Sequence, residues 1–137
     1  MYNTRTFISR KFKFEAAHSL PFHKGKCFYK HGHCFRGEVM ISSENLINGM
    51  VMDYNDLKEV IKKAILNVAD HQDLNTIFTD ETYYTTAENL CRFFFGRVKE
   101  ELFLTNPEIK LEYVSLKETD NSTSIVYNEN SSYVYNS

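Results

Sequence analysis

The residues with the most specific spacing are His31 and His33, which are separated by a single glycine. Residues two apart in a strand point to the same side, so both imidazoles can reach one metal ion. His18 ends an earlier extended segment, and the loop between would bring it beside this pair. Three neutral imidazoles form a catalytic type of zinc site, because the fourth position stays open for substrate or water. The alternative, a set of surface or core histidines with satisfied hydrogen bonds, is disfavoured because three of the five histidines converge on one hairpin.

A cysteine precedes the two histidines in the loop that would flank the metal. Cys27 lies four positions before His31, and a nearby cation favours the thiolate form, which makes it a candidate base or nucleophile. It could instead be a fourth zinc ligand, which would close the site and make it structural, or an inert thiol. Cys34 points away from the face of the two histidines, and Cys91 lies on an apolar helix stripe, so both are expected to be packing residues.

Two further features carry weaker signals. Asp70 and His71 are adjacent, and a carboxylate beside an imidazole can fix its tautomer and relay protons, although alone the pair more often stabilises a helix C-terminus. Glu118 shares one face of an expected strand with Val114 and Leu116. It is either solvated at the strand end or accepts two N–H donors from a guanidine-like ring edge, and the spacing leaves both alternatives open.

Strands that would position these residues are predicted near both ends of the chain. Residues 10–18 and 31–43 alternate apolar and polar side chains and are joined by a loop over 19–30. Residues 109–119 and 124–127 are rich in β-forming residues and would pair through a short turn.

Two amphipathic helices are predicted between the strand pairs. Apolar residues recur at three- and four-residue spacing over 54–68, with Asp53 or Asn55 as the N-cap. Thr85 with Glu88 three positions later matches a capping box, which predicts the start of the second helix.

The order strand, strand, helix, helix, strand, strand predicts an α+β fold with one four-stranded antiparallel sheet and two helices on one face. Residues 72–84 are expected to form a polar connection. We expect a single domain over residues 1–137, of which 128–137 form a loose tail. Such a sheet has two open edges, and each must be covered or paired. Joining the edges between subunits into a closed barrel would pair both of them.

Composition excludes several classes of function. The 16 Lys and Arg nearly balance the 18 Asp and Glu, for a net charge of -2, which argues against a nucleic-acid partner or a polybasic membrane surface. No apolar run approaches the roughly 18 residues that a membrane span needs. The first ten residues lack an apolar signal segment, and three cysteines without one indicate reduced thiols. We therefore expect a cytoplasmic protein.

Six segments together resemble the 6-pyruvoyltetrahydropterin synthase and 6-carboxy-tetrahydropterin synthase family. They occur in the family's order over nearly the whole chain, which is far more specific than any one of them. The segments are Phe-Glu-Ala-Ala-His (14–18), Cys-Phe-Tyr-Lys-His-Gly-His (27–33), Gly-Met-Val-Met-Asp-Tyr (49–54), Asp-His-Gln-Asp-Leu-Asn (70–75), Thr-Ala-Glu-Asn-Leu (86–90) and Lys-Glu-Thr (117–119).

The resemblance implies a role for each candidate residue. The implied zinc ligands are His18, His31 and His33, the implied catalytic base is Cys27, and its implied relay is Asp70 with His71. Glu118 matches the carboxylate that anchors the pterin ring. Thr86 and Glu88 match a segment near the pterin pocket, where a capping role for Glu88 competes. Two residues depart from the family pattern, Thr85 in place of Pro and Cys34 in place of Ser or Asn, and neither is expected to touch the chemistry.

The resemblance also implies the assembly and the reaction. The family has the tunnelling fold, in which subunits join sheets into a barrel, usually a hexamer of two stacked trimers with active sites between subunits. Only three residues separate Cys27 from His31, as in the bacterial 6-carboxy-tetrahydropterin synthases of the queuosine pathway. The implied substrate is 7,8-dihydroneopterin triphosphate, and the products are 6-carboxy-5,6,7,8-tetrahydropterin, acetaldehyde and triphosphate, without a redox cofactor.

Lysines of the 19–30 loop could attract the substrate triphosphate, although charge runs are usually solvated surface. They are Lys24, Lys26 and Lys30. Three other functions stay open. They are a 6-pyruvoyltetrahydropterin synthase that stops after triphosphate loss, a non-catalytic zinc-stabilised pterin-binding module, and a three-histidine zinc hydrolase.

Overall fold

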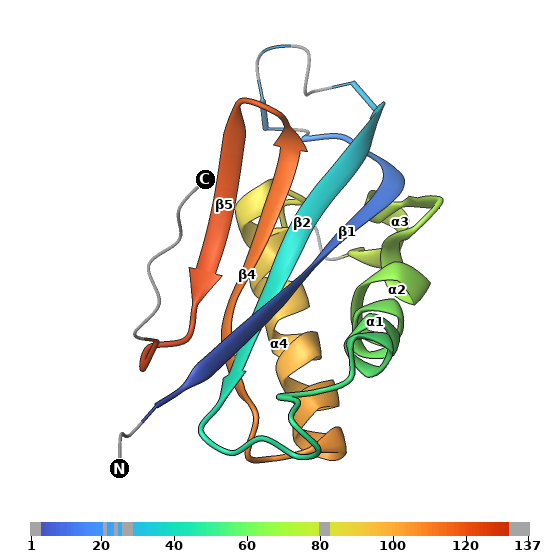
Figure 1. The fold of residues 1–137 in the computed structure, drawn as a ribbon. Helices are drawn as coiled ribbons and strands as arrows, with labels where there is room; N and C mark the ends of the chain where they lie inside the picture. Colours follow the sequence, from blue (N-terminus) through green and yellow to red (C-terminus); the bar gives the residue numbers. More distant parts are fainter. Residues whose placement is uncertain (1–3, 21, 24, 26–28, 80–82, 132–137) are drawn as a thin grey trace.

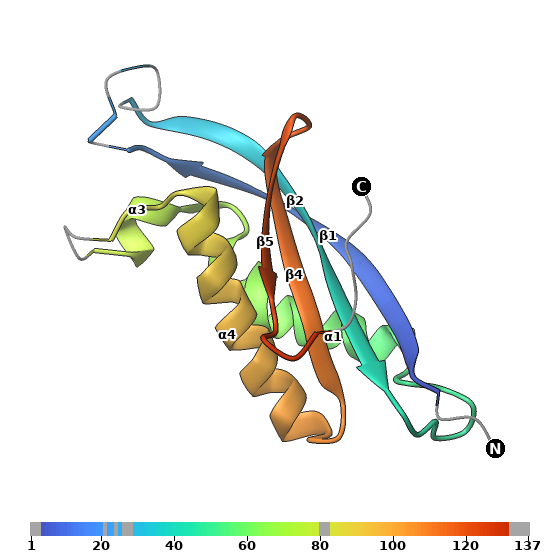
Figure 2. The same cartoon turned by 90° about the vertical axis from the view of Figure 1, so that its left-hand side faces the viewer.

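The structure, a computed structural model, describes residues 4–20, 22–23, 25, 29–79 and 83–131. One sheet carries all of the described strands, in the order β3-β1-β2-β4-β5, and the helices pack against one of its faces (Figure 1; Figure 2). The strands are β1 (Thr6–His18), β2 (His31–Ser43), β3 (Gln72–Asp73), β4 (Lys110–Thr119) and β5 (Ser122–Tyr127). The helical segments are α1 (Tyr54–Ile61), η2 (Lys62–Leu66), α2 (Asn67–Ala69), α3 (Leu74–Ile77) and α4 (Ala87–Thr105).

Strands β1 and β2 form a long antiparallel pair whose register sets the position of the histidines. His18 lies opposite His31, and Phe14 lies opposite Phe35. The predicted alternation in 10–18 is confirmed, because its even-numbered apolar residues and His18 are buried beneath the helices. Strand β1 begins earlier than predicted, at Thr6, and β2 has the predicted bounds.

The core lies between the sheet and the helices and is rich in aromatic rings. Phe14 stacks on Phe35 with ring centroids 5.0 Å apart, and it meets Phe94 of α4 edge-on at 5.7 Å. These contacts join both strands to α4 and fix the end of the β1–β2 pair that carries the histidines. Among the described residues, no helix combines the length and apolar character that a membrane crossing requires.

The first predicted helix is present as three consecutive segments, α1, η2 and α2, which run from Tyr54 to Ala69. Its N-cap is Asp53, whose carboxylate accepts a hydrogen bond from the backbone N–H of Asn55 at 2.7 Å. The preceding turn at Asn48 and Gly49 has positive φ at both residues, as a tight hairpin turn requires.

The capping-box prediction for the second helix is wrong by one residue. Helix α4 is capped by Thr86, whose hydroxyl accepts from the N–H of Asn89 at 3.2 Å, and Glu88 is an exposed residue of the first turn. The hydroxyl of Thr85 instead lies 3.3 Å from Nδ1 of His18 and donates to the carbonyl oxygen of Ser19.

The predicted four-stranded antiparallel sheet is incomplete. Within the segment predicted to be a polar connection, β3 pairs in parallel with Ala16 and Ala17 of β1, and α3 follows directly. Within the described part of the chain, the sheet is therefore mixed and has five strands. A strand of two residues has no alternation to detect, so the sequence pattern gave no sign of it.

Candidate metal centre

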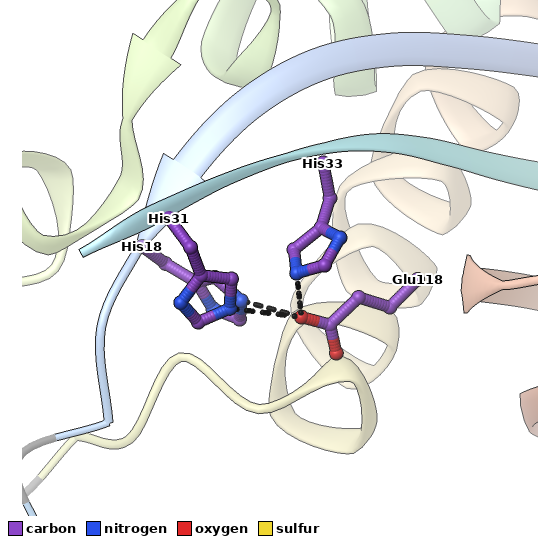
Figure 3. A group of neighbouring side chains, drawn as sticks. All are labelled: His18, His31, His33 and Glu118. Atoms are coloured by element: carbon purple, nitrogen blue, oxygen red, sulfur yellow. Dashed lines mark hydrogen bonds and ion pairs between the residues drawn. The ribbon is translucent and has the colours of Figure 1, made fainter. Parts of the chain in front are cut away.

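Four side chains from three strands converge at one end of the sheet (Figure 3). They are His18 from the end of β1, His31 and His33 from the start of β2, and Glu118 from β4, and their ligand atoms all lie within 4.8 Å of one another. The Oε1 atom of Glu118 lies 2.6 Å from Nε2 of His18, 3.1 Å from Nε2 of His33 and 3.5 Å from Nε2 of His31. The predicted convergence of the three histidines is confirmed as geometry, with Glu118 brought to the same point.

The strand register explains this convergence. The antiparallel pairing places His18 directly opposite His31, and the two-residue period of β2 turns His33 to the same face. The described pairing of β4 with β2 starts at Lys117 and Arg36. Beyond that pair the β4–β5 hairpin diverges from β2 (Figure 2), and Glu118 reaches toward the histidines from this end of β4.

Hydrogen bonds to the far side of two rings fix which nitrogen faces the centre. Nδ1 of His18 lies 2.7 Å from the carbonyl oxygen of Thr85, and Nδ1 of His31 lies 2.8 Å from that of Tyr29. A carbonyl only accepts, so each Nδ1 carries a proton and donates it. With the proton on Nδ1, Nε2 is the nitrogen left to bind a metal, and it faces the centre, as in the tautomer that a metal ligand needs.

Charge at the centre supports the same conclusion. The pKa of Glu118 lies below its usual value, chiefly because of its close contact with His18, so the carboxylate is ionised at neutral pH. Burial is the main cause of a lowered pKa at His33, so its ring is neutral. Lone pairs of neutral imidazoles facing a carboxylate repel it unless a cation lies between them. Three neutral imidazole nitrogens are a donor set that zinc binds with its fourth position open, so the three histidines fit the metal that the sequence predicts.

A cavity of about 310 Å³ adjoins the centre. It is lined by Cys34, Arg36, Lys117, Glu118, Thr119 and Asp120. Glu118 belongs both to the lining of this cavity and to the centre, so the two lie next to each other.

Asp70 and His71 lie on the outer edge of β1, outside the four-residue group. One carboxylate oxygen of Asp70 accepts from the backbone N–H of Glu15 at 3.0 Å and lies 3.0 Å from Nδ1 of His71. The backbone N–H of His71 donates to the carbonyl oxygen of Glu15 at 2.6 Å. His71 has a φ of 60° and a side chain that is 79% exposed. The structure thus joins the pair as a unit but does not bring it into the centre of the same chain.

Several other predicted residues are placed away from the centre or cannot be placed. Cys27 and Lys26 lie outside the described residues, as does Lys24. Lys30 forms an ion pair with Asp73. Cys91 is fully buried and its thiol donates to the carbonyl oxygen of Val114 at 3.2 Å, which confirms its packing role.

Thr85 contacts a predicted ligand although its own position was not predicted as part of the site. Its backbone carbonyl oxygen accepts the Nδ1 proton of the buried His18 at 2.7 Å, and its hydroxyl oxygen, which a proline would lack, lies 3.3 Å from the same atom. The only available signal was its place next to the Thr-Ala-Glu-Asn-Leu segment.

Comparisons with known proteins point to one family. The sequence model of the family described as 6-pyruvoyl tetrahydropterin synthase matches residues 7–129. A 6-carboxy-5,6,7,8-tetrahydropterin synthase of Haemophilus influenzae is 36% identical over 126 residues, which cover 76% of this chain and 89% of that protein. One from Synechocystis is 40% identical over 98 residues, covering 68% and 74%. The structure of Caenorhabditis elegans 6-pyruvoyl tetrahydropterin synthase superposes with a TM-score of 0.80 at 26% identity, covering 94% of this chain and all of that one (100%).

Proposed function

Because the chain belongs to the 6-pyruvoyl tetrahydropterin synthase family, we propose that it is a zinc-dependent 6-carboxy-5,6,7,8-tetrahydropterin synthase. Its substrate would be 7,8-dihydroneopterin triphosphate, and its products would be 6-carboxy-5,6,7,8-tetrahydropterin, acetaldehyde and triphosphate. This reaction would serve queuosine biosynthesis. The observation that carries the proposal is the convergence of His18, His31 and His33 with Glu118 on one point beside a cavity.

Each candidate residue has a distinct task in this proposal. Glu118, ionised at neutral pH, would accept two N–H donors from the edge of the pterin ring. A zinc ion held by the three histidines would supply Lewis acidity, polarising a side-chain oxygen of the substrate and acidifying the neighbouring C–H. The Cys27 thiolate would remove or return a proton, and His71, oriented by Asp70 at 3.0 Å, would complete the transfers.

The loop length favours the carboxy-forming reaction over the pyruvoyl-forming one. Three residues separate Cys27 from His31, as expected for the bacterial carboxy-tetrahydropterin synthases. The relatives from Haemophilus influenzae and Synechocystis bear that name, which supports the same assignment.

We also propose that subunits join their sheets into a barrel, in a hexamer of two stacked trimers. Among the described residues, β3 pairs with Ala16 and Ala17 alone on the outer edge of β1, and β5 is the last strand at the other side of the sheet. Both edges are thus available to a neighbouring copy. The exposed His71 on the β1 edge would then serve the centre of a neighbouring subunit.

The proposal is tested by incubating the purified protein with 7,8-dihydroneopterin triphosphate and identifying the products by mass. We expect 6-carboxy-5,6,7,8-tetrahydropterin with stoichiometric acetaldehyde. A pyruvoyl product without acetaldehyde would instead identify a 6-pyruvoyltetrahydropterin synthase. If the zinc-loaded protein showed no turnover, the alternative of a non-catalytic pterin-binding module would be favoured.

Two variants test the residue roles. Glu118→Gln should raise KM tenfold or more, because hydrogen bonds to a charged group contribute about 1.5–3 kcal/mol. Unchanged substrate affinity would favour a generic zinc hydrolase. Cys27→Ala should abolish turnover while leaving pterin binding intact, and full turnover by this variant would exclude Cys27 as the base.

A further inference from the structure

One residue holds the far side of the buried ring of His18. The His18 side chain is fully buried, and its Nδ1 lies 2.7 Å from the carbonyl oxygen and 3.3 Å from the hydroxyl oxygen of Thr85. Thr85 is itself only 1% exposed. Water is therefore excluded from this side of the ring, and Thr85 alone supplies both acceptors that the described contacts give to Nδ1.

The Thr85 hydroxyl can accept from His18 because its own proton has another destination. Its oxygen lies 3.4 Å from the carbonyl oxygen of Ser19, which only accepts. The hydroxyl proton therefore points to Ser19, and the hydroxyl lone pairs face Nδ1. Both oxygens of Thr85 thus favour a protonated Nδ1 and leave the lone pair on Nε2, at the metal centre.

Two asparagines fix the backbone on either side of this contact. The side-chain amide of Asn75 accepts from the N–H of Ser19 at 2.7 Å and donates to its carbonyl oxygen at 3.1 Å. The side chain of Asn89 donates to the carbonyl oxygen of Tyr84 at 2.9 Å, and its backbone N–H donates to the Thr86 hydroxyl. The residues that follow His18 and flank Thr85 are therefore tied to the start of α3 and of α4.

We propose that Thr85, supported by Asn75, is a positioning residue for the metal ligand His18. The Thr85 hydroxyl fixes the tautomer and direction of the ring, and Asn75 fixes the backbone that follows it. The inference rests on the proposed function only in requiring that the three histidines bind zinc. Partners that hydrogen-bond to metal-ligating histidines typically change metal affinity by about 10- to 100-fold.

The test measures zinc affinity in competition with a chromophoric chelator, together with the absorption spectrum of the cobalt-substituted protein. Thr85→Val keeps the shape and the backbone carbonyl but removes the hydroxyl. We expect it to weaken zinc binding about tenfold and to shift the cobalt bands, while Thr85→Ser restores both. Asn75→Ala should weaken zinc binding by a similar factor.

Two controls show whether a change in zinc affinity comes from the position of the His18 ring or from a loss of folding stability. Thr105→Val removes a hydroxyl that also bonds a backbone carbonyl, that of Glu101 at 2.9 Å, at the far end of α4. It should leave zinc affinity unchanged. Thermal unfolding of each metal-free variant then shows whether Thr85→Val folds as the parent does. If Thr85→Val is destabilised, its zinc affinity is compared with that of Thr85→Ser at a temperature where both variants are fully folded, because Thr85→Ser keeps the hydroxyl.

The inference would be overturned if Thr85→Val bound zinc within twofold of the parent's affinity and showed unshifted cobalt bands. The three-histidine site would then remain in place. Failure of the unaltered chain to bind zinc at all would overturn both this inference and the zinc dependence of the proposed function.

Discussion

Nε2 of His18 and Oε1 of Glu118 lie 2.6 Å apart although the two residues are separated by 100 positions in the chain. The contact joins the end of β1 to the end of β4 across β2, which contributes the other two histidines. A zinc ion held by the three histidines would join β1 to β2 at this point, so its binding free energy would also stabilise the fold.

Zinc removal should therefore lower the stability of the whole protein. Free zinc at a hundredfold excess over its Kd stabilises the folded state by about 2.7 kcal/mol, so chelation should lower Tm on the order of 10 °C. His31→Ala should abolish this difference. His23→Ala is the matched control, because His23 lies outside the four-residue group and should respond to the chelator as the parent does. A Tm independent of chelator in the parent would contradict the metal site.

A pair of glycine substitutions tests the packing that positions the site. A Cβ on Gly37 would lie 2.2 Å from the backbone oxygen of Ser115 and 2.4 Å from Cζ of Phe12, so Gly37→Ala must displace a strand or a core ring. We expect a loss of about 3 kcal/mol in the free energy of unfolding. Gly96→Ala in α4 meets no atom within 4 Å and should stabilise by about 0.5–1 kcal/mol. Urea unfolding measures both, and a tolerated Gly37→Ala would refute this packing.

The main strands and helices were predictable because their side chains follow simple periods. The strand predicted over residues 31–43 has the bounds of β2, and its two-residue period placed His31 and His33 on one face. The spacing of apolar residues likewise gave the helix that starts after Asp53. In these elements, burial of one face fixes both the local structure and the direction of the functional side chains.

What the sequence could not predict depends on contacts between distant segments. Strand β3 exists because Gln72 and Asp73 meet the edge of β1, and neither residue has a strand pattern of its own. Thr85 acquires its role from a contact with His18, 67 positions away. The position of Glu118 at the histidines follows from the divergence of β4 from β2, which no local pattern encodes.

The buried thiol of Cys91 should make stability depend on pH in the alkaline range. Burial raises its pKa to about 12, whereas an unfolded cysteine titrates near ~8.5. Below the unfolded value both states are protonated and stability is unaffected. As pH rises from there toward 12, the unfolded state loses a proton that the folded state keeps, so stability falls by about 1.4 kcal/mol per pH unit. Urea unfolding across pH 8 to ~10.5 should show this slope reduced in Cys91→Ala, and identical slopes would contradict it.

His71 combines an unfavourable backbone conformation with an exposed side chain, so its removal should affect activity rather than stability. A non-glycine residue at φ 60° carries about 1 kcal/mol of strain, which glycine relieves while losing a similar amount of chain entropy. His71→Gly should therefore unfold within about 1 kcal/mol of the parent yet lose turnover by about 10²- to 10⁴-fold. Asn48→Gly, at φ 53° in a turn, is the matched control that should keep turnover. Turnover retained by His71→Gly would remove His71 from the mechanism.

Mixing two inactive variants should restore activity if His71 serves the centre of a neighbouring subunit. Each proposed active site would take Cys27 from one subunit and His71 from the next. A site at a junction between a Cys27→Ala subunit and a His71→Gly subunit can then hold both original residues. After dissociation and equimolar reassembly, about a quarter of the sites would be intact, and turnover should recover to about that fraction. If both residues served the same chain's centre, every site would keep one defect and the mixture would stay inactive. A double variant, Cys27→Ala with His71→Gly, mixed with either single variant is the control. It should give no recovery, because no pairing of those subunits supplies both residues.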